Sequence, residues 1–221
     1  MTQESPDVKS RKTRLYEYMT NTKEGFFHIF QAKTIRPLIV FGCTLSVLMW
    51  LSIEYINEAA MINYRIQPEY RGLLIAAAKV LALVVLNVIV IRKINSDEHK
   101  LLYLLFMTIG VFGLYSVGIK SIFLVAFLGF NLVSSTNSSF IRPILHDHID
   151  SKWRATSISA YSFVSNLAQA IASIGVGFML QKQGVIFVQR ALLVLFIVVS
   201  VPALFTYLTR SKNNKAFKYF H

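Results

Sequence analysis

The chain has 221 residues, of which 54% are hydrophobic and 15% are charged, and its formal net charge is +12. So high an apolar fraction with so few charges excludes an ordinary soluble domain and indicates an integral membrane protein, with the lipid bilayer as its first partner. The basic residues lie between apolar runs rather than on one face, which argues against nucleic acid as a partner. The single cysteine, Cys43, excludes a disulfide framework or a cysteine metal cluster within one chain.

The residues before the first apolar run are polar and basic. Residues 1–19 predict a disordered cytoplasmic segment. The segment TNTKEGFFHIFQAKTIRP combines a capping residue, an acidic first turn and three phenylalanines, so it predicts a short amphipathic helix over 20–34 on the inner membrane face. No stretch here is apolar enough for a cleavable signal peptide, so we expect the first span to direct insertion.

Six apolar segments separated by polar or basic residues predict six transmembrane helices. A hydrocarbon layer of about 30 Å requires about 20 residues, each rising about 1.5 Å. The predicted spans form a domain over residues 35–209 and are 37–58, 72–91, 101–118, 121–141, 155–180 and 185–208. The third and fourth lie so close in sequence that they must form a tight hairpin. The fifth is rich in Ser, Ala, Asn and Gln, so we expect it to be the span best hidden from lipid.

The Lys and Arg residues of the connections set the expected orientation, because cytoplasmic loops are enriched in these residues. One side carries the basic residues before the first span, those of the second and fourth connections and those of a tail over residues 210–221. The other side carries only Arg65, Arg71, Lys120, Lys182 and Arg190. We therefore expect a multi-pass protein of the cell membrane with both termini in the cytoplasm.

Two segments resemble a known family of transporters. The first, KEGFFHIFQAKTIRPLIVFG, is similar to the join between the central loop and the seventh helix of major facilitator superfamily (MFS) proteins. The second, IRPILHDHIDSKWRATSISAYSFVSNLAQAIASIGVGFMLQKQG, is similar to the family's tenth and eleventh helices, with a Pro, a short loop, an Arg-Ala-Thr-x-x-Ser run and a small-residue helix ending in Gly. The resemblance covers about residues 20–209 and leans toward the multidrug and macrolide efflux type.

The resemblance implies an all-α, six-transmembrane-helix bundle equivalent to the carboxyl-terminal half of the MFS fold. It also implies transport of a small-molecule substrate by alternating access, as a proton-coupled efflux antiporter. A complete member has two six-helix halves with the substrate site between them. The other half is then either a separate amino-terminal chain, with this chain a fragment or split product, or a second copy in a homodimer. The alternative is a non-transporting membrane protein, such as a truncated remnant or an assembly subunit.

Three charged residues fall inside the predicted spans, where a charge normally faces a cavity or a partner. Lys79 lies about 10 Å deep in the second span, where it either lines a cavity that takes an anionic group or extends its stem to the outer interface. Glu54 and Glu58 share one face of the first span. Each either exchanges a proton in a proton-coupled exporter or lies at the interface, and the deeper Glu54 is the preferred coupling residue and a candidate partner of Lys79.

Uncharged polar residues cluster in the fourth and fifth spans. Asn131, Asn166 and Gln169 fall near the membrane midplane when depth is counted from the span ends at about 1.5 Å per residue. They either line the substrate path or form hydrogen bonds between helices. The same two spans also carry a set of further polar residues: Ser134, Ser135, Asn137, Ser162 and Ser165.

The inner connection between these spans holds the candidates for a cytoplasmic gate, Arg142, Asp147 and Arg154. By resemblance, Arg154 belongs to the contacts that lock the outward-facing state, whereas the alternative is a positive-inside anchor. His146 and His148 do not predict a metal site, because residues i and i+2 lie on different helix faces and no third ligand is near. The chain also lacks a nucleotide-binding glycine loop and catalytic motifs, so we expect no cofactor and no enzyme activity.

Overall fold

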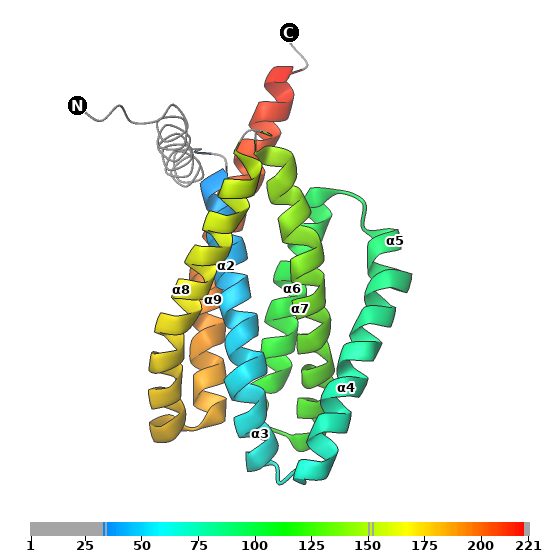
Figure 1. The fold of residues 1–221 in the computed structure, drawn as a ribbon, viewed down its shortest axis with the longest axis vertical. Helices are drawn as coiled ribbons and strands as arrows, with labels where there is room; N and C mark the ends of the chain where they lie inside the picture. Colours follow the sequence, from blue (N-terminus) through cyan, green and yellow to red (C-terminus); the bar gives the residue numbers. More distant parts are fainter. Residues whose placement is uncertain (1–32, 34, 150, 152, 219–221) are drawn as a thin grey trace, which may run out of the picture.

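The computed structural model describes residues 33, 35–149, 151 and 153–218, with the side chains of 89–91 and 212–218 left aside. The segment 1–19 and the amphipathic helix predicted over 20–34 lie, apart from Lys33, outside the described residues. The described part of the chain is helical and contains no strand, which confirms the all-α prediction (Figure 1). Its elements, in chain order, are α2 (Ile35–Leu51), η1 (Ser52–Ile56), α3 (Asn57–Asn63), α4 (Pro68–Val85), η2 (Leu86–Val90), α5 (Ile91–Lys93), α6 (Asp97–Tyr115), α7 (Lys120–His148), α8 (Arg154–Gln183) and α9 (Val185–Lys218).

Five helices in the described residues are long and apolar enough to cross a membrane. They are Ile35–Asn63, Pro68–Val88, Lys120–His148, Arg154–Gln183 and Val185–Ser211. The remaining long helix, α6, has 19 residues but carries Asp97, Glu98 and Lys100 in and beside its first turn. Its apolar stretch therefore begins only at Leu101, and by length and composition α6 is the weakest of the six expected spans.

The helix boundaries follow local signals in the sequence. Pro68 stands at the first position of α4, and the Ser96 side chain caps α6 by accepting a hydrogen bond from the backbone N–H of His99. The predicted third span overruns its helix, which ends at Tyr115. The chain turns there through Gly118, whose φ of +77° suits glycine, and α7 starts two residues later, so the two helices form the expected tight hairpin.

The helices pack in two matching sets of three. In the first set, α2, α4 and α6 follow one another, and in the second, α7, α8 and α9 do. Helix α2 packs against α8 and α9, and α7 packs in the same way against α4 and α6. The contacts between α2 and α7 and between α6 and α9 close the bundle. The packing therefore has an approximate two-fold symmetry that relates α2 to α7, α4 to α8 and α6 to α9.

This packing leaves one side of the bundle open. Helices α2, α6, α7 and α9 form the centre, with α4 and α8 attached at opposite edges (Figure 1). Helices α6 and α9 cover one side of α2 and α7, whereas no described element covers the other side. We call this uncovered side of α2 and α7, bounded by α4 and α8, the open face.

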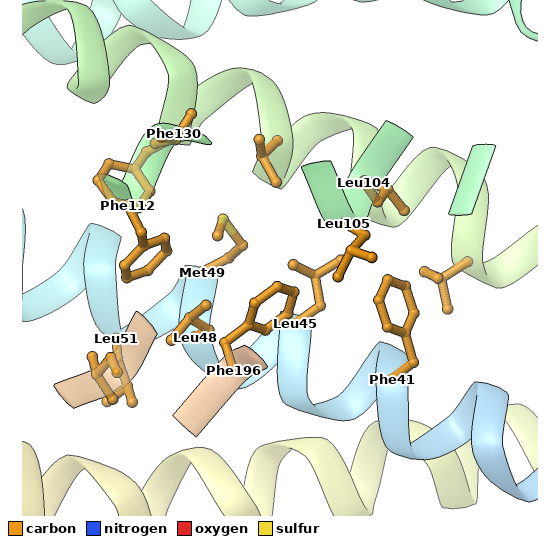
Figure 2. Packing of buried hydrophobic residues seen from close by; sticks show 14 of the residues in the cluster. Phe41, Leu45, Leu48, Met49, Leu51, Leu104, Leu105, Phe112, Phe130 and Phe196 are labelled. Atoms are coloured by element: carbon orange, nitrogen blue, oxygen red, sulfur yellow. The ribbon is translucent and has the colours of Figure 1, made fainter. Parts of the chain in front are cut away.

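The apolar core lies between α2, α6, α7 and α9, as Figure 2 shows. Phe112 of α6 and Phe130 of α7 stack edge to face at 4.8 Å, and Phe41 of α2 lies 6.4 Å from Phe196 of α9. Close approach of α6 and α7 requires Gly129, because a Cβ built there would lie 2.6 Å from a methyl carbon of Val111. The core thus fixes α2 and α7 rigidly behind the open face.

The fifth predicted span, α8, is poorly buried within the chain, so the prediction that it is the best hidden span is wrong. Only 11% of the most apolar window of α8 is buried inside the chain, against 50% for the helix Ile35–Asn63. Asn166 of α8 is exposed, and Ser162 and Gln169 are only partly covered by the other described helices, whereas Ser157 and Ser165 are buried. The expectation rested on composition alone, which does not distinguish burial within one chain from contact with water or with a second chain.

Candidate functional site

Helix α8 carries two separate rows of side chains, a polar row that is partly exposed and an apolar row that is exposed. Residues advance by about 100° along an α-helix, so a spacing of four, three and four places Ser162, Asn166, Gln169 and Ser173 in one row. An apolar row, turned well away from the polar one, consists of Phe163, Leu167, Ile171, Ile174 and Phe178. The apolar row suits contact with lipid, whereas the polar row requires water or other protein beside it.

The polar row borders a pocket of about 180 Å³ on the open face. Helices α2, α7 and α8 form its walls. We call it the polar pocket, and its lining residues are Ser46, Asn137, Ser138, Ile141, Arg142, Tyr161, Ser162, Ser165, Asn166 and Gln169. Asn166 lies about 18 Å along α8 from Arg154, at the rise of about 1.5 Å per residue, so the pocket reaches the middle of the bundle.

A hydrogen-bonded chain ties the three walls of the pocket together. The Asn137 side-chain amide donates to Ser46 Oγ at 3.1 Å, and Ser46 Oγ lies 3.3 Å from the Tyr161 hydroxyl. These contacts join α7 to α2 and α2 to α8. Gly42 makes them possible, because a Cβ built there would lie 2.9 Å from both the Tyr161 hydroxyl and a methyl carbon of Ile141.

The side chains that line the polar pocket carry a net positive charge. Arg142 is the one charged residue among those that line it, and no Asp or Glu does so. Arg142 is exposed and forms no ion pair within the described part of the chain. It lies close enough to Tyr161 to interact with it electrostatically. The Oδ1 atom of Asn137 is buried without a hydrogen-bond partner among the described residues, so the pocket also holds an unused acceptor.

Lys79 is exposed on α4, and the approximate symmetry of the bundle predicts that it faces the open side from the opposite edge. In α8, Ser165 is buried against the bundle, and the next residue, Asn166, is turned by about 100° toward the open face. In α4, Ala78 is buried and the next residue is Lys79. The approximate two-fold symmetry relates α4 to α8 and reverses the direction of the helix. If Ala78 corresponds to Ser165, then Lys79 corresponds to Asn166, and both side chains turn toward the open face.

The π-helical turn η1 sets which residues of the first helix reach this face. An uninterrupted α-helix would continue the row of Ser46 and Trp50 at positions 53 and 57. The π turn takes up one extra residue, so Glu54 and Glu58 continue the row instead, and Asn57 is buried at 3% exposure. The carboxylate of Glu54 is exposed and has no ion-pair partner within the described residues, Lys79 included.

Glu58 is paired at the outer end of the bundle. Arg71 Nη1 donates to its carboxylate at 2.6 Å, and Arg71 Nε donates to the backbone oxygen of Ile66 at 3.0 Å. Arg71 therefore fixes the loop between α3 and α4 as well as the ion pair.

Removing Arg71 should cost more stability than removing its partner. Half-exposed ion pairs contribute about 0–1 kcal/mol, whereas a hydrogen bond from a charged group contributes about 1.5–3 kcal/mol. We expect Arg71→Ala to lower the melting temperature of the detergent-purified chain more than Glu58→Gln does. Equal losses in the two variants would show that the bond to Ile66 contributes nothing.

The remaining predicted site residues lie outside the polar pocket. Asn131 is buried in α7, where its amide donates to the backbone oxygen of Phe127 at 2.9 Å. Asp147 is exposed near the end of α7. Arg154 donates to the Ile149 backbone oxygen at 3.5 Å, and its Nε is buried without a partner among the described residues. Of the nine predicted residues, Asn166, Gln169 and Arg142 are thus brought together.

The sequence interpretation missed four residues that line the pocket: Ser46, Ser138, Ile141 and Tyr161. Two of them, Ser46 and Tyr161, join helices that are distant in sequence. Both are single hydroxyl residues in otherwise apolar or mixed surroundings, and only their contact across α2 and α8 reveals them. A second cavity of about 260 Å³ lies on the other side of this contact, between α2, α8 and α9, and its lining is almost wholly apolar. The hydrogen bond from Ser165 Oγ to Cys43 Sγ, 3.2 Å long, stands between the two.

The site presents side chains that can form hydrogen bonds with a bound molecule. It offers hydroxyls, side-chain amides and one guanidinium, and within the described residues no three His, Cys, Asp or Glu side chains are placed to hold a metal ion. We found no match to the chain among protein-family models, curated proteins or solved structures. The geometry of the open face therefore carries the functional argument.

Proposed function

We propose that this chain is one six-helix half of a secondary transporter of the MFS type, with its open face forming one wall of a solute path. The observation that carries the proposal is the polar pocket at the middle of an otherwise apolar bundle. Exposed polar side chains at that depth are unfavourable against lipid and are retained where they line a water-filled path. The α6 apolar stretch completes the six spans of such a half.

The repeated packing of the helices supports the same proposal. Transporters of this class contain inverted repeats of three helices within each half, and their sites lie where the repeats meet. Here the two sets of three helices have matching neighbours, and the polar pocket lies where α2 and α8 meet α7. We place the half in the cell membrane with both termini in the cytoplasm, because the described basic residues Arg36, Lys100, Arg142, Arg154 and Arg210 lie at the end of the bundle where α2 begins.

The second half supplies the opposite wall. A pocket of about 180 Å³ is below the roughly 300–1,000 Å³ of sites for drug-sized ligands, so one half alone encloses only part of a solute. A separate amino-terminal half or a second copy of this chain covers the polar row of α8 and the exposed Lys79. Glu54, which has no ion-pair partner among the described residues, is the group we assign to proton coupling in the efflux cycle.

The proposal predicts that the polar row of α8 is in contact with water when the chain is in a membrane. In a Cys43→Ala background, we expect Asn166→Cys in proteoliposomes to react with the neutral reagent hydroxyethyl methanethiosulfonate at least about ten-fold faster than Leu167→Cys, because only a hydrated thiol ionises readily. The two positions are neighbours on α8, one on the polar row and one on the apolar row. Their comparison therefore removes differences in depth and reconstitution.

Each other outcome has a defined meaning. Slow reaction at both positions would mean that the polar row is dry, as in a non-transporting remnant or assembly subunit whose polar residues serve only packing, and would refute the solute path. Fast reaction at both positions would mean that α8 is not embedded in lipid. Gln169→Cys should repeat the result for Asn166→Cys, since both side chains line the polar pocket.

A further inference from the structure

We infer that the polar pocket receives a small anionic solute, with Arg142 as its counter-charge. This inference rests on the proposed function, because it names the class of solute for the same path. The resemblance to multidrug efflux proteins would favour cationic amphipathic substrates, but the lining of the pocket opposes that choice. A cation entering it would meet a guanidinium and no carboxylate.

The polar groups of the pocket suit an oxyanion. Arg142 presents a planar set of N–H donors that matches a carboxylate or phosphate, and it has no ion pair within the described residues. The side-chain amides of Asn166 and Gln169 and the hydroxyl of Ser162 stand around the same space, so each can donate a further hydrogen bond. The solute is therefore small and hydroxylated or carboxylated rather than aromatic and apolar.

The charge of the wider open face points the same way. Lys79 is exposed on α4, and the approximate symmetry of the bundle turns it toward this face, which adds a second cation. Of the two carboxylates in the row of Ser46, Glu58 is neutralised by Arg71, whereas Glu54 lies beyond the pocket toward the outer end. An anion approaching the pocket thus meets Arg142 and Lys79, whereas the nearest carboxylate named on the face, that of Glu54, lies outside the pocket lining.

At Asn166 the positive charge of Arg142 outweighs the negative charge of Glu54, so this position favours anions. That residue and Arg142 line one small pocket, whereas Glu54 is outside its lining. A unit positive charge about 8 Å away in water attracts an anion by about 0.5 kcal/mol and repels a cation by the same amount. Together these energies raise the local ratio of anions to cations by about five-fold. Any lower dielectric in the pocket raises that factor.

The test compares two thiol reagents of equal size and opposite charge. In the Cys43→Ala, Asn166→Cys chain in proteoliposomes, we would measure reaction rates with sulfonatoethyl and trimethylammonioethyl methanethiosulfonate, each divided by its rate with free 2-mercaptoethanol. We expect the anionic reagent to react faster by about five-fold or more and the preference to disappear in Arg142→Gln. Arg142→Lys should retain it, and Lys182→Gln, at the far end of α8, should leave it unchanged.

The result separates this inference from the proposed function. Equal normalised rates, or a preference for the cationic reagent, at a thiol that the neutral reagent labels readily would overturn the anionic solute while leaving the wet path intact. A preference that survives Arg142→Gln would remove Arg142 from the role and overturn the inference as stated. No labelling by any reagent would instead refute the path itself. Circular dichroism and monodisperse elution of each variant would show that it is folded.

Discussion

Replacing Gly42 with alanine is expected to lower the melting temperature of the purified chain by about 2–12 °C, at about 1–3 kcal/mol for overpacking and about 2–4 °C per kcal/mol. The new methyl group would lie 2.9 Å from both Ile141 and the Tyr161 hydroxyl, so either α2 moves away from α7 or Tyr161 leaves Ser46. The loss should appear in a fluorescence-detected thermal scan in detergent.

A matched glycine separates this contact from a general effect of alanine. A Cβ built on Gly113 meets nothing within 4 Å, so Gly113→Ala should be neutral or stabilise the helix by about 0.5–1 kcal/mol. Combining Gly42→Ala with Tyr161→Phe removes one of the two close contacts and should recover part of the loss. If Gly42→Ala melts at or above the wild-type temperature, the close approach of α2 to α7 and α8 is incorrect.

The second large effect is expected at Gly129 of α7, which packs directly against Val111 of α6. A Cβ there would lie 2.6 Å from Val111 Cγ2, and the stiff β-branched side chain has little freedom to move aside. Gly129→Ala should therefore destabilise the chain by about 1–3 kcal/mol and weaken the hairpin that supports the open face from behind. The measurement is again the thermal scan, together with the yield of monodisperse protein.

A double-mutant cycle tests whether the contact itself is responsible. Val111→Ala alone should also destabilise, because Val111 is 5% exposed and its loss leaves a small cavity. In the double variant, the alanine at position 129 fills part of that space, so the combined loss should be smaller than the sum of the single losses. Simple additivity would mean that the two side chains are not in contact.

The helices themselves could be predicted from the sequence because length and hydropathy determine them. The apolar runs gave five helices that the structure also shows as long and apolar enough to cross a membrane. Helix α6, the third predicted span, is the weakest in both length and hydropathy, because charged residues occupy its first turn. The ends of the helices were less predictable. Helix α7 continues through Pro143 to His148, beyond the predicted end at residue 141, and α6 ends at Tyr115, before the predicted end at residue 118. Turn geometry and packing decide these ends.

The candidate site could be predicted only where polarity is unusual for its surroundings. Asn166 and Gln169 were evident from depth alone, and both line the polar pocket. Asn131 had the same signal but bonds its own helix, because periodicity does not say which neighbour a face will meet. Ser46, Tyr161 and the role of Gly42 depend on the contact of helices distant in sequence, which no local pattern contains.

The π turn at Ser52–Ile56 has a consequence for the chemistry of the outer end. Everything beyond this turn is out of phase by one residue with the part before it. If the extra residue moved past Glu58, the segment would rotate by about 90–100°, and Asn57, whose amide is now buried without a partner among the described residues, would come to the surface. Glu58 would rotate away from Arg71 to the partly exposed position that Ala59 now holds. A shift of one peptide would thus replace a carboxylate by an amide on the open face, while the inner end of the helix stayed in place.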